Sequence, residues 1–473
     1  MEAAGLAMLA LVILLMIASG LPAFIVLIGV SVVFAAFGVC SGAFSYSLLT
    51  ALPARLSGLL ETDLLQALPL YVLMGALLDH LPLADILFRA GARVFSGTPA
   101  APLLSAIGVG AMLAPMNGSV GASAATLSRV IHPRLISRGT SAERSLSIVC
   151  VVSTLGVVVP PSLVLILLGD TMLRAHTEAI NATGVRARVI NTQDVFQGAL
   201  IPAGLFLITC IALAWWLGRR AVADAAPPGR PLGPGEWVVA ILAPLFIVGL
   251  LASVVTGYMY AVEAAATGAL VLALSGLATR TLRGEVLATV LRDTMAVTGA
   301  LFAIFVAATT FTLVFRAFGS DRLLAVAVAQ LSGSPTGTAV AVLAFIGACA
   351  LVLDAFEIIL VVVPVVMPPV LMQIPDPVWM AVLTLLVLQA SFLVPPFGYA
   401  VMMARTRIAQ RLDLHLVVRA LAPFVCAQLL VLAAVIAMPQ LTRLAKPGAT
   451  APAPLSDEEV RRRLDAIPGI NPQ

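Results

Sequence analysis

Long apolar runs recur along the chain, and few charged residues separate them. Because the runs are continuous and do not alternate apolar with polar positions, they predict helices and not the strands of a membrane barrel. Several runs reach the ~20 residues that a helix needs to cross the hydrocarbon of a bilayer. The runs lie at residues 3–19, 22–40, 66–79, 198–218, 236–257, 263–279, 294–315, 337–353 and 421–438. The predicted fold class is an all-α polytopic membrane protein.

Two stretches of the chain repeat each other at a constant offset. The matched positions are Ser119 and Asp354, Pro133 and Pro368, and Pro160 and Pro395, each pair 235 residues apart. Within each stretch the two prolines are 27 residues apart. Paired, proline-interrupted hydrophobic segments in two halves of a chain are typical of secondary transporters whose site lies between the repeats. We predict two repeats, each with a re-entrant hairpin followed by a broken helix.

The distribution of arginines gives the two repeats opposite orientations. The loop at 133–144 holds three arginines, whereas its counterpart at 368–379 has no basic residue. Basic loops are retained on the cytoplasmic side of a membrane, so the first loop is predicted inside and the second outside. The repeats are therefore predicted to be inverted. The same reasoning places residues 169–194 in a long outside loop.

Composition shifts and the repeat divide the chain into units. Residues 221–235 are rich in proline and glycine, which is typical of a linker. Residues 82–95 and 320–332 occupy matching places before the two hairpins and are too charged or too short to cross, so we predict helices along the membrane interface. The predicted units are N-terminal scaffold helices at 1–64, repeat 1 at 65–220, a cytoplasmic linker at 221–235, scaffold helices at 236–300, repeat 2 at 301–440 and a polar tail at 441–473.

Composition excludes several classes of protein. Hydrophobic residues make up 61% and charged residues 11% of the chain, and the mean hydropathy is +1.08, whereas soluble domains are ~25% charged. The net charge of +4 comes from arginines that stand singly in loops, which disfavours a nucleic-acid partner. The five cysteines lack metal-ligand spacing. Metalloprotease, serine-hydrolase and ATP-binding motifs are also absent, which disfavours an intramembrane enzyme or an ATP-driven pump.

The first hairpin tip, residues 117–126, consists of small and polar residues. Broken backbone persists at membrane depth only where it lines a cavity or is buried in protein. A bare helix N-terminus at the tip would attract carboxylate oxygens. Carbonyls released at the breaks, together with the hydroxyls of Ser119, Thr154 and Ser391, are hard oxygen ligands that suit Na⁺. The alternative for Ser123 and Thr126 is close helix packing by small residues.

Two acids interrupt the apolar stretch at 348–366. Asp354 and Glu357 are three residues apart, so they share a face if the segment is helical. An ionisable group at membrane depth costs at least ~2.5–3.5 kcal/mol, which makes it a functional hypothesis. We predict that Asp354 binds a cation or caps a half-helix, and a role as helix cap alone is the alternative.

Short segments spread over nearly all of residues 1–440 carry a family resemblance. They are Gly20-Leu21-Pro22, Leu68-Pro69-Leu70-Tyr71-Val72-Leu73-Met74-Gly75, Asn117-Gly118-Ser119, Thr154-Leu155-Gly156, Glu263-Ala264-Ala265, Leu353-Asp354 and Pro395-Pro396-Phe397-Gly398. On these residues the chain resembles the large membrane subunit, or permease, of tripartite ATP-independent periplasmic (TRAP) transporters. The stretch from Gln389 to Ala400 is similar to the subgroup labelled mannitol/chloroaromatic. Asn117 departs from the pattern, since many members have a hydroxyl or small residue there.

The resemblance implies an elevator-type, sodium-coupled importer of small organic acids, a multi-pass protein of the bacterial inner membrane. It implies a small membrane subunit and a periplasmic binding protein as partners, besides membrane lipid. Na⁺ would be the coupling ion, and no organic cofactor is expected. Moving one charge through 100 mV is worth ~2.3 kcal/mol, so we expect two or more Na⁺ per carboxylate. The alternative is a stand-alone cation-coupled carboxylate or anion symporter that needs no binding protein.

The resemblance also implies two half-sites for substrate and cation. The first consists of Asn117, Gly118, Ser119, Thr154 and Gly156. The second consists of Asp354, Gln389, Ser391, Pro395 and Gly398. Among these residues, the predicted Na⁺ ligands are Ser119, Thr154, Asp354 and Ser391.

Overall fold

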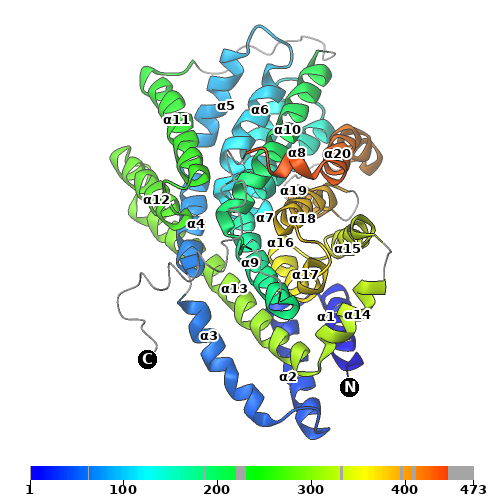
Figure 1. Cartoon of the computed structure of the whole chain (residues 1–473). Helices are drawn as coiled ribbons and strands as arrows, with labels where there is room; N and C mark the ends of the chain where they lie inside the picture. Colours follow the sequence, from blue (N-terminus) through cyan, green and yellow to red (C-terminus); the bar gives the residue numbers. More distant parts are fainter. Residues whose placement is uncertain are drawn as a thin grey trace, which may run out of the picture.

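The fold is helical throughout the part of the chain that the computed structural model describes. The described residues are 2–61, 63–160, 162–184, 188–219, 231–330, 334–394, 398–406 and 412–445, and no strand occurs among them. Seven of the described helices are long and apolar enough to cross a membrane, or up to eight if a bent pair counts as one span. The predicted all-α polytopic class is confirmed (Figure 1).

An outer group of helices forms one side of the molecule. These are α1 (Ala3–Ser19), α2 (Ala23–Cys40), α3 (Leu52–Leu60), α4 (Asp63–His80), α11 (Pro234–Thr256), α12 (Ala261–Ala278) and α13 (Gly284–Ala317). The long helix α13 packs against α2, α3 and α4, and α12 packs against α4. Their outward faces carry exposed apolar side chains such as Leu14, Ile241 and Met295. Such faces suit lipid and not water, as expected for the scaffold of a membrane protein.

The first repeat follows from α4 without interruption. Its elements are α5 (Leu83–Val94), α6 (Ala101–Leu113), the short turn η2 (Ala114–Asn117), α7 (Val120–Ile136), α8 (Ala142–Val158), α9 (Leu163–Thr183) and α10 (Thr192–Gly218). Helix α4 from Leu65 and helix α5 are bent by 63°. Helices α6 and α7 form hairpin 1, and α8 and α9 form the first broken helix.

The second repeat follows from α13 in the same order. Its elements are α14 (Ser320–Gln330), α15 (Pro335–Cys349), α16 (Ala355–Glu357), the π-helical turn η3 (Ile358–Val362), α17 (Val363–Leu371), α18 (Pro377–Leu393), α19 (Tyr399–Thr406) and α20 (Leu414–Ala437). Helices α15 to α17 form hairpin 2, and α18 and α19 form the second broken helix. Helices occur within the ranges predicted at 82–95 and 320–332, as α5 and α14, and their place along the membrane interface stays a prediction.

The two repeats agree in their helix ends as well as in their order. Helices α8 and α18 begin and end at positions 235 residues apart, and so do α7 and the segment from α16 to α17. Side chains at matching positions cap these helices: Ser119 and Asp354 for the hairpins, and Ser141 and Asp376 for the broken helices. Each accepts a hydrogen bond from the backbone N–H three residues later, at 2.9 to 3.4 Å. The correspondence ends after the breaks, where α9 has 21 residues and α19 has 8.

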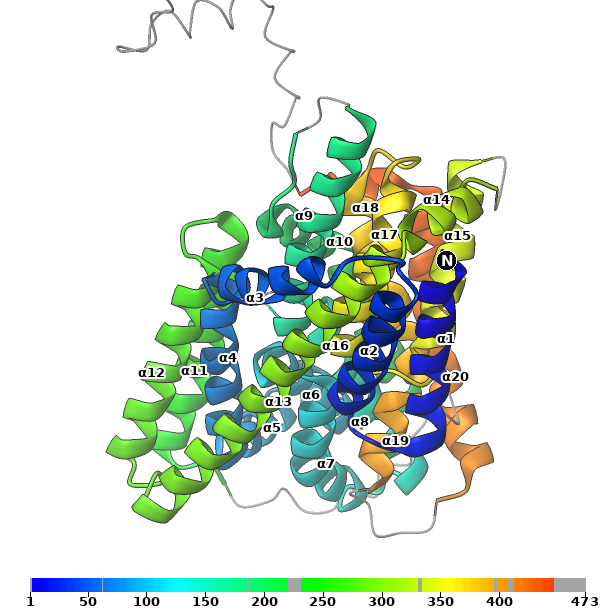
Figure 2. The ribbon, with the colours of Figure 1, turned by 90° about the horizontal axis from the view of Figure 1, so that it is seen from below.

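The repeats interlock at the centre of the molecule. In hairpin 1, α7 packs against α8 of its own repeat and against α19 of the other, while α17 of hairpin 2 packs against α9. Helices α8 and α18 pack against each other, and α18 is buried along its whole length. Figure 2 shows the outer helices α11, α12 and α4 on one flank of this core. Each hairpin therefore contacts the far half of the other repeat's broken helix.

The prediction of a long loop at 169–194 is wrong, and the placement of this segment outside the membrane stays a prediction. Residues 163–183 form α9 and residues 192–218 form α10, which leaves a short connection between them. Buried Met172, Ala175 and Ala179 fall on one face of α9, while Asp170 and Arg174 form an ion pair of 2.9 Å on another. The segment is an amphipathic helix, and its charged face made it look like a loop. The linker residues 221–230 and the tail from residue 446 lie outside the described residues.

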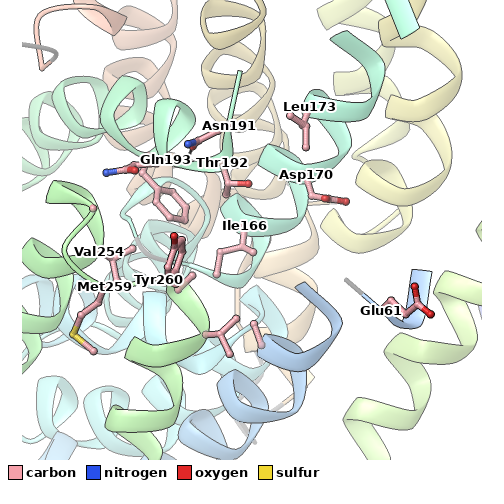
Figure 3. A pocket seen from close by; sticks show the side chains of 15 residues that line it. Glu61, Ile166, Asp170, Leu173, Asn191, Thr192, Gln193, Val254, Met259 and Tyr260 are labelled. Carbon is pink, nitrogen blue, oxygen red and sulfur yellow. Dashed lines mark hydrogen bonds between the residues drawn. The ribbon is translucent and has the colours of Figure 1, made fainter. Parts of the chain in front are cut away.

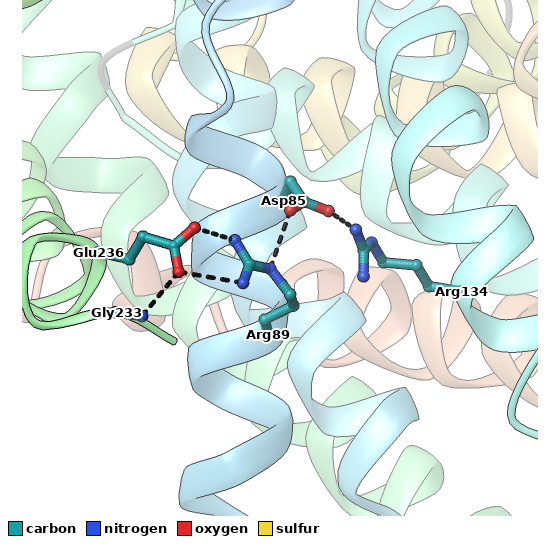
Figure 4. A network of polar contacts seen from close by, with 5 residues as sticks. All are labelled: Asp85, Arg89, Arg134, Gly233 and Glu236. Carbon is teal, nitrogen blue, oxygen red and sulfur yellow. Dashed lines mark hydrogen bonds and ion pairs between the residues drawn. The ribbon is translucent and has the colours of Figure 1, made fainter. Parts of the chain in front are cut away.

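An ionic network joins hairpin 1, α5 and the scaffold (Figure 4). Arg89 of α5 contacts Asp85 at 2.9 Å and Glu236 of α11 at 2.6 Å. Asp85 also pairs with Arg134 near the end of α7. Glu236 in turn accepts a hydrogen bond from the backbone N–H of Gly233 at 2.9 Å. A chain of charges therefore connects α11 to hairpin 1 through α5.

Replacing Arg89 with glutamine should lower the thermal stability of the detergent-purified protein. The Arg89 side chain is only 14% exposed, and its loss leaves two carboxylates without their shared cation. We expect a loss of about 1.5–3 kcal/mol, the range for hydrogen bonds to charged groups. The control is Arg174→Gln, since that arginine is 52% exposed and forms an i,i+4 pair worth about 0.3–0.5 kcal/mol. Equal losses in both variants would contradict a structural role for the network.

Candidate functional site

Hairpin 1 reverses direction through a glycine. Gly118 has φ of +76°, a conformation that glycine adopts without steric cost. Ser119 is extended, and its Oγ accepts a hydrogen bond from the N–H of Ala122 at 3.1 Å. The helix start that we expected to be bare is thus capped. The first amides of a helix have no acceptor within it, and the Ser119 hydroxyl supplies one. The cap occupies one of those amides and leaves the N–H groups of Val120 and Gly121 without an intrahelical acceptor.

Asn117 stands at the tip of this hairpin with an unusual environment. The residue is 6% exposed, and neither Oδ1 nor Nδ2 has a hydrogen-bond partner in the described part of the chain. Its backbone lies against α4, where a Cβ on Gly75 would be 3.1 Å from the Asn117 Cα. At least about 90% of buried polar groups in proteins are hydrogen-bonded. The Asn117 amide therefore supplies a donor and an acceptor that no described residue uses.

Helix α8 approaches the tip of hairpin 1 very closely. A Cβ on Gly156 would lie 2.5 Å from the carbonyl oxygen of Ala114, so only glycine permits this approach. Thr154 is fully buried, and its hydroxyl donates to the Val151 carbonyl at 2.8 Å. The oxygen of Thr154 keeps its acceptor capacity. The structure thus brings Gly156, and with it the end of α8, beside the Ala114–Asn117 turn.

Hairpin 2 starts its second arm with two carboxylates that cap each other's backbone. Asp354 Oδ1 accepts from the Glu357 N–H at 2.9 Å, and Glu357 Oε2 accepts from the Asp354 N–H at 3.1 Å. The capping role of Asp354 is therefore visible, and its role as a cation ligand stays a prediction. A single π-helical turn, Ile358–Val362, follows directly. Such turns interrupt helices frequently at functional sites.

The residues predicted on the second broken helix do not all face the hairpins. Gln389 is fully buried, and its Oε1 accepts from Gln428 of α20 at 2.9 Å. Ser391 lies toward hairpin 2, with its Oγ 3.3 Å from the Cβ position of Gly347 in α15. Gly398 donates to the Val394 carbonyl at 2.7 Å just after the break. Pro395 lies outside the described residues.

Tyr399 lies beside the tip of hairpin 1, and sequence analysis did not name it as a site residue. Its hydroxyl is 3.0 Å from the Cβ position of Gly121 in hairpin 1. Its ring contacts that of Phe392, with centroids 5.8 Å apart. The signal in the sequence that could have identified Tyr399 was its position at the start of α19, the second half of the broken helix.

Two hydroxyls for which packing was the alternative have structural partners. Ser123 donates to the Ala114 carbonyl at 3.2 Å and so closes the turn of hairpin 1. Thr126 forms a hydrogen bond to Asp79 of α4, and Arg129 approaches the same carboxylate at 3.9 Å. These contacts attach the second arm of hairpin 1 to the scaffold.

Two cavities lie along α9. One of about 500 Å³ lies between α9, the start of α10 and the connection from α11 to α12 (Figure 3). Another of about 950 Å³ lies between α3, α9, α13 and hairpin 2. Asp170 and Leu173 line both, and none of the predicted site residues lines either. Among the described residues, no cluster of three or more His, Cys, Asp or Glu side chains suits a metal ion.

Interlocked inverted repeats, each with a hairpin and a broken helix, define a membrane transporter. The chain belongs to the TRAP transporter large permeases: the model of the tripartite ATP-independent periplasmic transporter, DctM component, matches residues 10–441. It is therefore a multi-pass secondary transporter subunit and not an enzyme. Membership in this family implies a small membrane subunit and a periplasmic binding protein as partners.

Individual relatives agree with this assignment. A putative TRAP transporter large permease of Haemophilus influenzae is 22% identical over 80% of this chain and 90% of its own. The ectoine TRAP transporter large permease of Halomonas elongata is 24% identical over 69% of this chain and 73% of its own. The isethionate TRAP transporter permease of Oleidesulfovibrio alaskensis is 22% identical over 71% of this chain and 51% of its own.

The fold also has a counterpart among solved structures. The Alcanivorax borkumensis transporter YdaH, whose crystal structure is described as having an unusual topology, superposes with a TM-score of 0.58. The match covers 85% of this chain and 90% of that one at 14% sequence identity. At this identity the likeness concerns the fold alone.

Replacing Gly156 with alanine should displace the tip of hairpin 1. The new methyl group would meet the Ala114 carbonyl at 2.5 Å, and overpacking of this kind costs about 1–3 kcal/mol. Reduced uptake and a lower melting temperature are the expected results. Gly108→Ala in α6 is the matched control, because open space surrounds that position. If both variants behave like the wild type, the close approach of α8 to the tip is wrong.

Proposed function

We propose that this chain is the transporting subunit of a sodium-coupled importer of small organic acids in the bacterial inner membrane. A periplasmic binding protein delivers the substrate, and the hairpins and broken helices move as an elevator against the scaffold. The observation that carries the proposal is the buried Asn117 amide, whose two polar atoms have no described partner at the tip of hairpin 1. A bound solute or ion supplies the partners that no described residue provides.

Several features support an anionic substrate at this tip. The N-terminus of α7 carries the positive end of the helix dipole and two amides without an intrahelical acceptor. Such helix ends bind carboxylates. The small residues Gly118 and Gly121 let a ligand approach the backbone closely. Two relatives are named for the small organic solutes isethionate and ectoine, which supports a small organic solute for this chain.

The hairpin 2 carboxylates support a coupling cation. Asp354 and Glu357 lie within the apolar interior of the chain, and among the described residues neither forms an ion pair with an arginine or lysine. Two neighbouring negative charges there favour a cation, and Na⁺ also offsets the charge of a carboxylate substrate. Two or more Na⁺ per carboxylate let the membrane potential assist uptake. Family membership favours this three-part system over the stand-alone symporter.

Na⁺ should raise the melting temperature of the purified chain, with its small subunit, in a saturable way. A ligand that binds only the folded form adds about 2.7 kcal/mol at one hundred times its dissociation constant. The titration is made against K⁺ at constant ionic strength, so that general salt effects cancel. Equal responses to Na⁺ and K⁺ would contradict sodium coupling.

Asp354→Asn separates the cap from the charge. Asparagine is as good an N-cap as aspartate, so hairpin 2 should fold as before while the negative charge is lost. We expect a melting temperature near that of the wild type in K⁺, and a Na⁺ response that is strongly reduced. Asp376→Asn is the matched control, because Asp376 caps α18 at the equivalent place in its element. An unchanged Na⁺ response in Asp354→Asn would show that Asp354 is a cap alone.

A further inference from the structure

The cavity of about 950 Å³ along α9 is lined by five charged side chains, and the proposed function uses none of them. Three are arginines from three different helices: Arg55 of α3, Arg174 of α9 and Arg316 of α13. The other two are the carboxylates Asp170 and Glu178 of α9. Positive charge is therefore in excess. The volume suits a small organic solute, since ligand pockets are about 300–1,000 Å³ in size.

Two of the arginines keep N–H donors that no described residue uses. Arg316 donates to Glu178 through Nη2 alone, at 2.6 Å, and its side chain is 34% exposed. Arg55 is exposed, and within the described part of the chain its side chain forms no hydrogen bond or ion pair. A guanidinium has five N–H donors and binds a carboxylate through two of them at once. An anion in the cavity therefore meets donors that are not already occupied.

The cavity lies between the scaffold and hairpin 2. Arg55 and Arg316 belong to the scaffold helices α3 and α13, whereas α9 packs against α17 of hairpin 2. Leu360 and Pro364 of hairpin 2 line the same cavity. Leu360 follows Glu357 by three residues, so along the chain the cavity wall is about one helical turn from the carboxylate pair. A solute in the cavity is thus held next to the hairpin for which we propose the coupling cation.

We propose that this cavity is a second solute site, in which Arg55 and Arg316 hold the oxyanion of a small organic acid, a carboxylate or a sulfonate, before it reaches the hairpin tips. The part of α9 that lines the cavity, residues 170–181, is predicted to lie on the outer side, where the binding protein delivers solute. The anion accepts hydrogen bonds from the Arg316 N–H groups that Glu178 leaves open, and Arg55 adds a second positive charge. The proposal rests on the proposed function for the class of solute.

An anionic lipid headgroup carries the same oxyanion chemistry and is the other source of a ligand. Basic pockets between transmembrane helices bind such headgroups. The rest of the lining favours a soluble anion, because Thr177, Asn181, Thr309 and Thr312 add polar groups to the cavity. The experiment separates the two sources.

A cysteine placed in the cavity measures its charge. Thr312→Cys lies one turn before Arg316 on α13, in a chain whose exposed Cys40 and Cys426 are replaced by serine. The purified chain with its small subunit reacts with anionic sulfonatoethyl methanethiosulfonate or with cationic trimethylammonioethyl methanethiosulfonate. In either reaction the thiolate forms a disulfide with the charged tail and releases methanesulfinate. The anion-to-cation ratio of the two rates reports the potential in the cavity.

Removing one arginine should change this ratio. Arg55→Gln or Arg316→Gln should lower it by about three- to tenfold at low salt, the effect of one unit charge several ångströms away. Arg93→Gln is the matched control, because Arg93 is an exposed arginine of α5 and does not line the cavity. Arg55→Gln provides the test if Arg316→Gln does not fold, since Arg55 has no described ion pair to lose.

Protection by soluble anions tests whether the cavity holds an anion as well as attracting it. Succinate and isethionate are titrated against chloride at constant ionic strength, and the Thr312→Cys thiol is followed with uncharged methyl methanethiosulfonate. At least one of the two anions should slow the reaction in a saturable way, with a midpoint that rises about tenfold in Arg55→Gln and in Arg316→Gln, the effect of one charge-assisted hydrogen bond. The reaction is also followed in nanodiscs with and without phosphatidylglycerol.

The outcomes distinguish this site from the proposed function. If Arg55→Gln and Arg316→Gln leave the rate ratio as Arg93→Gln does, or if neither soluble anion protects the thiol, the second site is overturned and the sodium proposal stands. Protection by phosphatidylglycerol alone identifies a lipid site and also overturns the proposal. If the soluble anions protect the thiol while Na⁺ and K⁺ affect the melting temperature equally, sodium coupling fails and the cavity stays a solute site.

Discussion

The need to satisfy backbone polar groups in an apolar interior governs this structure. Each helix that starts within the core leaves amides without intrahelical partners, and in hydrocarbon an unsatisfied group costs several kcal/mol. The chain meets this need with Ser119 in hairpin 1 and with the reciprocal Asp354 and Glu357 pair in hairpin 2. Breaks at membrane depth can therefore persist, and they place polar atoms where a solute and an ion can bind.

The two tips meet this constraint with different chemistry. Hairpin 1 uses a neutral hydroxyl, which leaves the positive end of the α7 dipole uncompensated. Hairpin 2 uses two carboxylates, which introduce negative charge beside the start of its second arm. A repeated architecture thus carries opposite electrostatics at its two ends. Asn117 adds an amide that can serve either kind of ligand.

Sequence analysis succeeded where the signal was local or repeated, and failed where it was not. The offset of 235 residues predicted the hairpins and broken helices, and the matched polar positions Ser119 and Asp354 proved to be helix caps. The segment at 169–194 was mistaken for a loop, because the charged face of α9 outweighed its buried face. Gln389 accepts a hydrogen bond from Gln428 of α20 through its Oε1, and its role in the site stays a prediction.

The sequence alone determined the membrane class, the inverted repeats and the polar caps, because composition, spacing and cap chemistry are properties of short segments. The tertiary structure decided which segments meet. An internal repeat predicts two similar units but does not specify that α7 packs on α19 and α17 on α9, since that choice depends on side chains that are far apart in the chain. For this reason Tyr399 and Gly121 come together only in the folded molecule. The packing of α19 against α7 places the Tyr399 hydroxyl beside Gly121, where a larger side chain would leave little room.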